Sequence, residues 1–307
     1  MRIRRFTTTL VAGVLTIGLA GCTGAPDRED EARDIRDRVA AMPGVTDADL
    51  VYENDIWAGT RFELRVDMDT ATDEQIGAVA DEIDHKRGDE FADFDQRAEI
   101  NVARWTTLAG GERLPDDAAR IAAQLRRLRA DVQADTIRYG AGTDGSSVRV
   151  DGATATSEAV DAVLQVFTDP PDTIEVAPDE GADAPFWAVR SRMSIADKQR
   201  IDGQLAALAP AQPGYVTVLD GRVVHLTMGV TSPAAAYQEI AHAVRALDAR
   251  RGEPVDLSWA AGPAGTKGPR WAGSAEIGGC DHGSHMGELL PDAQALQQRI
   301  RDEFGSC

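Results

Sequence analysis

The chain has 307 residues, of which 43% are hydrophobic, enough to build packed cores in two or three domains. It carries 51 Asp and Glu residues against 32 Lys and Arg residues, a formal net charge of −19 at pH 7. Such a surface repels nucleic acid and anionic lipid headgroups, so the composition argues against a nucleic-acid-binding protein.

The first 22 residues read as an export signal. Arg2, Arg4 and Arg5 precede a mostly apolar stretch, residues 6–20, which runs into the sequence Leu-Ala-Gly-Cys22. A basic start, a short apolar segment and small residues before a cleavage point are typical of a secretory signal. Fifteen helical residues rise about 22 Å, too little for the hydrocarbon core of about 30 Å. One reading of this segment is an ordinary signal peptide in which Cys22 follows small residues by coincidence.

Leu-Ala-Gly-Cys22 resembles the lipobox of bacterial lipoproteins, in which the cysteine receives diacylglycerol and becomes the new N-terminus. The resemblance implies that residues 1–21 are removed and that Cys22 carries the lipid. Residues 22–31 are mostly small, polar or charged, which predicts a short flexible stalk. Because the removed segment contains three Arg and no acid, the net charge of the mature chain is −22. We therefore expect an extracytoplasmic protein on the cell membrane. The scarcity of Lys, three of 32 basic residues, resembles actinobacterial usage.

Apolar triplets at helical spacing recur along the rest of the chain. The first helix of each predicted module carries one such triplet: Ile35, Val39 and Met42; Ile121, Leu125 and Leu128; Ile201, Leu205 and Leu208. A second helix follows 39 to 41 residues later and carries another: Ile76, Val79 and Ile83; Val160, Val163 and Phe167; Ile240, Val244 and Leu247. This recurrence predicts three similar modules, residues 32–112, 113–194 and 195–276.

Strands with alternating apolar residues precede the second helices: Phe62 to Met68, Val148 to Val150 and Val224 to Met228. A further strand with a tryptophan ends each module: residues 101–107 with Trp105, 186–193 with Trp187 and 255–260 with Trp259. We expect these tryptophans in the core, where such aromatic rows usually lie. The predicted fold class is α+β. Each module has the order helix-strand-strand-helix-strand, with a small, mainly antiparallel sheet covered by helices.

Three helix starts are predicted from capping residues. Thr72 with Gln75 can form a capping box, Ser157 can cap the middle helix, and Ser232-Pro233 would place proline at the first helical position.

Residues 277–307 read as a loop followed by a C-terminal helix from Pro291 to Phe304. In an exported protein, Cys280 and Cys307 favour a disulfide, with two free thiols as the alternative. The segment Cys280-Asp281-His282-Gly-Ser-His285 also offers Asp281, His282 and His285 as alternative metal ligands, although a disulfide would remove the thiolate. We predict the disulfide, with no resident metal or cofactor.

Other candidate motifs have simpler structural explanations. Gly140-Ala-Gly142-Thr-Asp-Gly145 has the spacing of a dinucleotide-binding loop, but strands flank it, which predicts a hairpin. Asp67-Met-Asp69 begins like a calcium loop without the required glycine and predicts a strand end before a helix. His225 and His242 are expected to be structural. Signatures of serine hydrolases, zinc proteases and P-loop enzymes are absent from the sequence, so we predict no catalytic residue.

The third module, from Gly221 through Gly229 and Ser232-Pro233 to Leu247, resembles the BON domain of bacterial envelope proteins. This family has the order helix-strand-strand-helix-strand and is associated with envelope or phospholipid binding, and the resemblance implies no catalytic residue. The leading hypothesis is a non-catalytic, lipid-anchored protein that binds a partner protein or another component of the cell envelope. The alternatives are a lipoprotein that binds a metal or small ligand and a cell-wall hydrolase.

Overall fold

The computed structural model describes residues 26–305 except 56, 58, 144, 262–270 and 281–288. In these residues the elements follow one another as α1 (Glu29–Ala40), β1 (Asp47–Asp55), β2 (Gly59–Asp67), α2 (Asp73–Arg87), the short 3-10 helix η1 (Gly88–Phe91), β3 (Asp95–Ala103), β4 (Thr106–Gly110), α3 (Ala118–Asp131), β5 (Thr136–Gly142), β6 (Gly145–Ala153), α4 (Thr156–Val166), β7 (Thr173–Pro178), β8 (Phe186–Val189), α5 (Ile195–Ala206), β9 (Gln212–Leu219), β10 (Arg222–Gly229), α6 (Ala236–Leu247), β11 (Val255–Ala260), β12 (Ala272–Ile277) and α7 (Pro291–Phe304). The chain is therefore mixed α/β.

The twelve strands of the described residues form a single sheet in chain order. Each hairpin is antiparallel, and each helix from α2 to α6 connects two neighbouring parallel strands. The prediction of small separate sheets is wrong. Strand pairing crosses both expected boundaries, because Leu108 of β4 pairs with Tyr139 of β5, and Ala188 of β8 pairs with Thr217 of β9.

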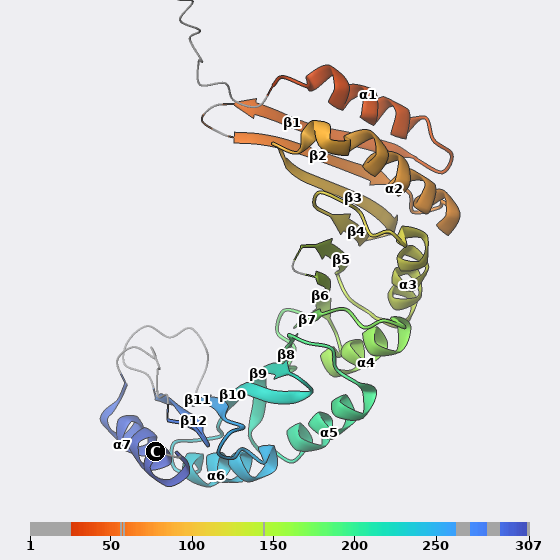
Figure 1. Cartoon of the computed structure of the whole chain (residues 1–307). Coiled ribbons are helices and arrows are strands. Elements are labelled where there is room, and N and C mark those ends of the chain that lie inside the picture. Colours follow the sequence, from red (N-terminus) through yellow and green to blue (C-terminus); the bar gives the residue numbers. More distant parts are fainter. Residues whose placement is uncertain are drawn as a thin grey trace, which may run out of the picture.

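The element order is a sixfold succession of one helix and one hairpin, followed by α7. The helices lie along the outer side of a curved sheet whose inner, concave face they leave open (Figure 1). Two strands span about 9–10 Å of sheet, close to the distance of about 8–10 Å at which helices pack side by side. One helix for every hairpin can therefore cover the sheet without a gap, and nothing in the spacing stops the sheet at a module boundary.

All six predicted core helices are present, and the C-terminal helix runs from Pro291 to Phe304 as expected. Each predicted module lacks one strand that the structure contains, because two strands follow its second helix where one was expected. Residues 101–107, predicted as one strand, include the end of β3, a turn and the start of β4. The short strands β7 and β12 were not predicted, since neither has a long alternating pattern.

The core lies between the helices and the face of the sheet that they cover. Ile100 and Val150 have no exposed surface, and Trp187 and Trp259 are fully buried as predicted. The same prediction is wrong for Trp105, which is 62% exposed. Trp105 lies in the two-residue turn between β3 and β4, so it does not alternate with the inward residues of either strand.

The capping box of Thr72 and Gln75 is confirmed. The Ser157 prediction is wrong, because α4 begins after Ala155 and has no side-chain cap. The Ser232-Pro233 prediction is wrong by a turn, since α6 begins at Ala236. The predicted stalk is also too long, because α1 begins at Glu29 and takes residues 29–31 into a helix.

Ser157 instead belongs to a buried polar cluster that joins α4 to α5. The Lys198 side chain has no exposed surface, and its Nζ lies 2.6 Å from Ser157 Oγ and 2.6 Å from a carboxylate oxygen of Asp202. Nζ also lies 4.8 Å from the centre of the Trp187 ring. The ammonium group is thus satisfied by fixed partners inside the helix layer, as a buried charge must be.

The two edges of the sheet are protected in different ways. Along β12, α7 replaces the missing strand: the Ser274 amide donates to Gln297 Oε1 (2.8 Å), and Arg301 Nε donates to the Ser274 carbonyl (3.2 Å). Along β1, acidic side chains alternate, a pattern that discourages the addition of a further strand: Asp47, Asp49, Glu53 and Asp55.

Candidate functional site

The open face of the sheet carries a continuous line of polar side chains. The strand registers place the following residues side by side from β2 to β7: Asp67, Asn101, Thr107, Arg138, Arg149 and Glu175. Residues in register project from the same face of a sheet, and their immediate neighbours in sequence project from the other. The neighbours are buried and apolar, so the covered face is the core and the open face is available to a ligand: Val66, Ile100, Leu108, Ile137, Val150 and Ile174.

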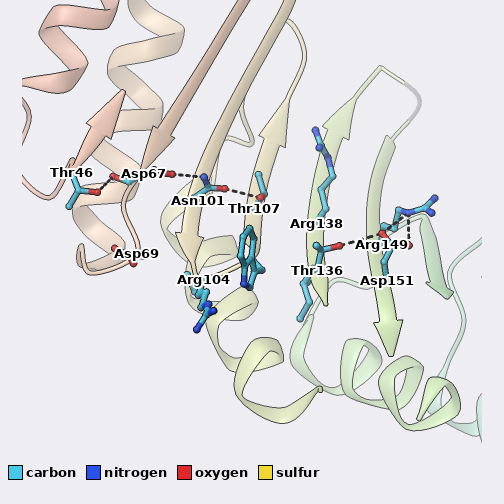
Figure 2. A pocket seen from close by; sticks show the side chains of 13 residues that line it. Thr46, Asp67, Asp69, Asn101, Arg104, Thr107, Thr136, Arg138, Arg149 and Asp151 are labelled. Atoms are coloured by element: carbon cyan, nitrogen blue, oxygen red, sulfur yellow. Dashed lines mark hydrogen bonds and ion pairs between the residues drawn. The ribbon is translucent and has the colours of Figure 1, made fainter. Parts of the chain in front are cut away.

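A cavity of about 650 Å3 lies along most of this line, at the rim of the sheet where β2 and β3 end (Figure 2). Its lining comes from β2 to β6 and the segments next to them: Thr46, Asp67, Asp69, Asn101, Ala103, Arg104, Trp105, Thr107, Thr136, Ile137, Arg138, Arg149 and Asp151. The size falls within the range of about 300–1,000 Å3 that is usual for small-ligand sites. We call it the rim cavity.

Several polar groups in the rim cavity are held in place by one another. Asn101 Nδ2 donates to Asp67 (2.5 Å), and Thr107 Oγ1 donates to Asn101 Oδ1 (2.9 Å), which gives the chain of side chains drawn in Figure 2. On the other side, Arg149 Nε donates to both carboxylate oxygens of Asp151 (3.0 and 2.9 Å). These groups are fixed before any ligand arrives, so a ligand would not have to order them.

Trp105 is the aromatic side chain of the rim cavity. Its backbone has a φ of 57°, in the left-handed region that a bulky residue rarely adopts. The neighbouring Arg104 guanidinium lies 6.0 Å from the centre of the indole ring. Trp105 is thus an exposed aromatic residue with an unusual backbone conformation in the lining of a cavity, and such backbone outliers cluster at ligand sites.

Glu99 anchors the arginines beside the cavity. Its carboxylate lies 2.6 Å from Arg138, 2.6 Å from Arg97 and 3.7 Å from Arg65. Burial raises the pKa of the Glu99 carboxyl, but Arg138 and Arg97 outweigh burial and leave the pKa below its ordinary value. Glu99 therefore stays ionised and holds Arg138 in position.

A second cavity of about 560 Å3 adjoins the rim cavity and shares Arg138 and Arg149 with it. We call it the glycine groove, because Gly140, Gly142 and Gly145 line it. The prediction that these glycines belong to a hairpin is confirmed, since they lie in β5 and β6. The two cavities together extend from the end of β2 to β7 and Arg190.

The predicted site residues mostly fall outside the described part of the chain. This holds for the lipidation residue Cys22, for Cys307, and for the alternative metal ligands Asp281, His282 and His285. Cys280 is described, just after β12. The Gly278 amide donates to the Phe304 carbonyl (3.0 Å), so the chain leading to Cys280 lies beside the end of α7. That placement agrees with the predicted disulfide, which stays a prediction.

The two histidines have protein partners. His225 Nε2 lies 3.2 Å from Thr227 Oγ1, and His242 Nε2 lies 2.6 Å from the Ala207 carbonyl oxygen. Among the described residues there is no group of three or more His, Cys, Asp or Glu side chains that could hold a metal ion. Across that same part of the chain, no helix is both long and apolar enough to cross a membrane.

The prediction for Asp67-Met-Asp69 is confirmed, because β2 ends at Asp67 and α2 begins at Asp73. The sequence reasoning missed that Asp67 and Asp69 line a cavity. Residues of the rim cavity come from five strands, and their assembly depends on the pairing of β2 with β3 and of β4 with β5. The one available signal was Arg104-Trp105, which interrupts the alternation of a predicted strand.

Carboxyl groups with a shifted pKa in the described residues are all shifted downward: Glu74, Glu99, Asp172, Asp197 and Glu253. A general acid of a hydrolase needs the opposite shift. These groups therefore serve as stable carboxylates, in ion pairs and hydrogen bonds.

No protein-family model matches the chain, and neither a curated protein nor a solved structure matches it. The resemblance to BON domains therefore rests on the segment from Gly221 to Leu247. In the structure this segment comprises β10, the following turn and α6.

Proposed function

We propose that the protein is a lipid-anchored, extracytoplasmic binding protein of the cell envelope, and that the rim cavity and glycine groove form its binding surface. The observation that carries the proposal is the contrast between the two faces of the sheet. Helices cover one face, while the other presents fixed polar groups and two adjoining cavities. The lipobox at Cys22 supports the location, and no residue is proposed as catalytic.

The anchor is tested by fractionation of cells that produce the wild-type protein or Cys22→Ser. We expect the wild type in the membrane fraction, extractable by detergent, and the variant in the soluble or unprocessed form. Mass spectrometry of the wild-type N-terminal peptide should show a diacylglycerol on Cys22. An unmodified cysteine in a protein that stays soluble would contradict the lipoprotein assignment.

The binding surface is tested by site-specific photocrosslinking in intact cells. A photoreactive residue replaces Thr107, in the rim cavity, or Arg127, an exposed residue of α3 on the helix-covered side. We expect a specific adduct from position 107 and none from position 127. Equal adduct patterns from the two positions would contradict the assignment of the open face as the binding surface.

The Cys280–Cys307 disulfide is proposed as well, on the proximity of Gly278 and Phe304. It would close a loop of about 28 residues and stabilise the native state by about 3–4 kcal/mol through chain entropy. Peptide mapping without reductant should recover the two cysteine peptides as one linked species. Two separate, alkylated peptides would show that the thiols are free.

A further inference from the structure

We infer that the ligand of the rim cavity and glycine groove is an uncharged saccharide chain, with one sugar ring stacked on Trp105. This inference rests on the proposed function, because it names the chemical class that the proposed binding surface would take.

Trp105 supplies a surface that suits a sugar ring. An indole is a broad, flat, apolar ring with a polar N–H at one edge, and Trp105 leaves 62% of its surface exposed. One face of a pyranose ring presents mainly C–H groups, which pack flat on such a ring, while its hydroxyls remain at the perimeter. The backbone of Trp105 is left-handed, and this turn places the side chain in the lining of the cavity.

The polar lining suits hydroxyl groups. Asp67, Asn101 and Thr107 alternate as acceptors and donors along one wall. Asp69 and Arg104 are exposed and line the same cavity. A sugar hydroxyl can donate to a carboxylate and accept from a guanidinium at once, so neighbouring hydroxyls can satisfy both kinds of group.

The charges of the rim cavity favour a neutral ligand. Its lining contains three Asp and three Arg residues. Arg138 is paired with Glu99, and Arg149 is paired with Asp151 and Glu175. A polyanion would have to displace these carboxylates, and a quaternary ammonium ligand would need an aromatic cage, whereas Trp105 is the single aromatic residue of the lining.

The shape of the combined surface favours a chain over a single ring. The glycine groove continues from the rim cavity past Arg138 and Arg149. A side chain added at Gly142 would meet no atom within 4 Å, so the groove is open above this residue. A linear saccharide with its first ring on Trp105 can therefore extend across β5 and β6.

The test uses the full-length protein in detergent, labelled with 5-fluorotryptophan and observed by fluorine NMR. The chain has five tryptophans, and the signals of Trp105 and Trp57 are assigned from Trp105→Phe and Trp57→Phe. The probes are three uncharged tetrasaccharides (chitotetraose, cellotetraose and mannotetraose) and one acidic tetrasaccharide, tetragalacturonate. We expect at least one uncharged probe to shift the Trp105 signal and leave Trp57, which is 95% exposed in the loop between β1 and β2, unchanged.

Variants then test the two parts of the surface. Trp105→Ala should weaken binding of the active tetrasaccharide at least tenfold, with Trp57→Ala as the control that leaves it unchanged. Gly142→Leu should weaken binding of the tetrasaccharide at least fivefold but leave binding of the corresponding monosaccharide unchanged. Its control is Gly203→Leu, because Gly203 is exposed on α5 and also has open space around it.

Several results would overturn the inference. A Trp105 signal that moves only with tetragalacturonate would refute an uncharged ligand. If Gly142→Leu weakens binding of the tetrasaccharide and of the monosaccharide equally, the ligand is not a saccharide chain that extends into the glycine groove. A signal unmoved by all four probes, or a protein adduct at position 107, would refute the saccharide while leaving the proposed function intact. The proposed function itself fails separately, if positions 107 and 127 give equal adducts.

Discussion

The two faces of the sheet are built from the same strands but have different roles: one packs in the core, and the other carries the polar groups of the candidate site. In β3, Ile100 projects to the helix-covered face and has no exposed surface, whereas its neighbour Asn101 projects to the open face and lines the rim cavity. The covered face is held mainly by apolar packing, with the buried Lys198 cluster between α4 and α5 as a polar exception. The open face is held by ion pairs and hydrogen bonds, which are individually weak but set the positions of the groups that a ligand would meet.

The largest difference in stability between the two faces is expected when Ile100 and Asn101 are each substituted. Ile100→Ala removes buried methyl groups and leaves a cavity, so it should lower the free energy of unfolding by about 2–5 kcal/mol. Asn101→Ala removes side-chain hydrogen bonds at a partly exposed position and should lower it by about 1 kcal/mol. Urea denaturation of both variants measures the difference. Equal losses would mean that the open face is as important for the fold as the core.

A second test asks whether the helix layer depends on its buried charge. Lys198→Ala leaves Asp202 and Ser157 without their ammonium partner and should cost about 3 kcal/mol, the low end for a broken buried pair because Asp202 is 37% exposed. The double variant Lys198→Met/Asp202→Leu removes both charges and should recover much of the loss, as followed by thermal denaturation. If the single variant is as stable as the wild type, the cluster is not what joins α4 to α5.

A third, smaller effect concerns the pH dependence of the open face. The pKa of Glu99 is lowered in the folded state, so its ion pairs stabilise the protein above the unfolded pKa of about 4.5. That contribution is lost as the pH falls below this value and through the folded pKa. Glu99→Gln should therefore cost about 1 kcal/mol at pH 7 and progressively less below pH 4.5, measured by urea denaturation at each pH. A cost that is the same at low and neutral pH would mean that the arginines do not depend on the charge of Glu99.

The smallest expected effect on stability comes from Arg104→Ala. Arg104 is exposed in the turn before β4, and Arg127 is exposed on α3. Substitution of either should change the free energy of unfolding by no more than about 0.5 kcal/mol. Only Arg104→Ala should weaken saccharide binding, measured by the shift of the fluorine signal of Trp105. If the two variants bind the saccharide equally well, Arg104 is not part of the binding surface.

The helices could be predicted because each carries its own signal. Apolar residues at spacings of three and four mark one face of a helix, and this pattern placed α2 around Ile76 and α3 around Ile121. Strands with four alternating residues, such as β2, were equally clear. Short strands and turn residues were not, because a pattern of two or three residues does not distinguish a strand from a loop. Trp105 was therefore assigned to the core, although the turn between β3 and β4 turns it outward.

The sequence by itself determined the helix positions and the inward face of the longer strands, because these depend on residues close together in the chain. The export signal in residues 1–22 also has a local pattern, and it stays a prediction. The sequence did not determine where one sheet ends and the next begins, since that depends on backbone groups at strand edges, which pair regardless of side-chain identity. The tertiary structure decided that β4 pairs with β5 and β8 with β9, and so joined twelve strands into one sheet. The same pairing brought Asp67, Thr107 and Arg138 into one line, which formed the cavity that no local pattern could reveal.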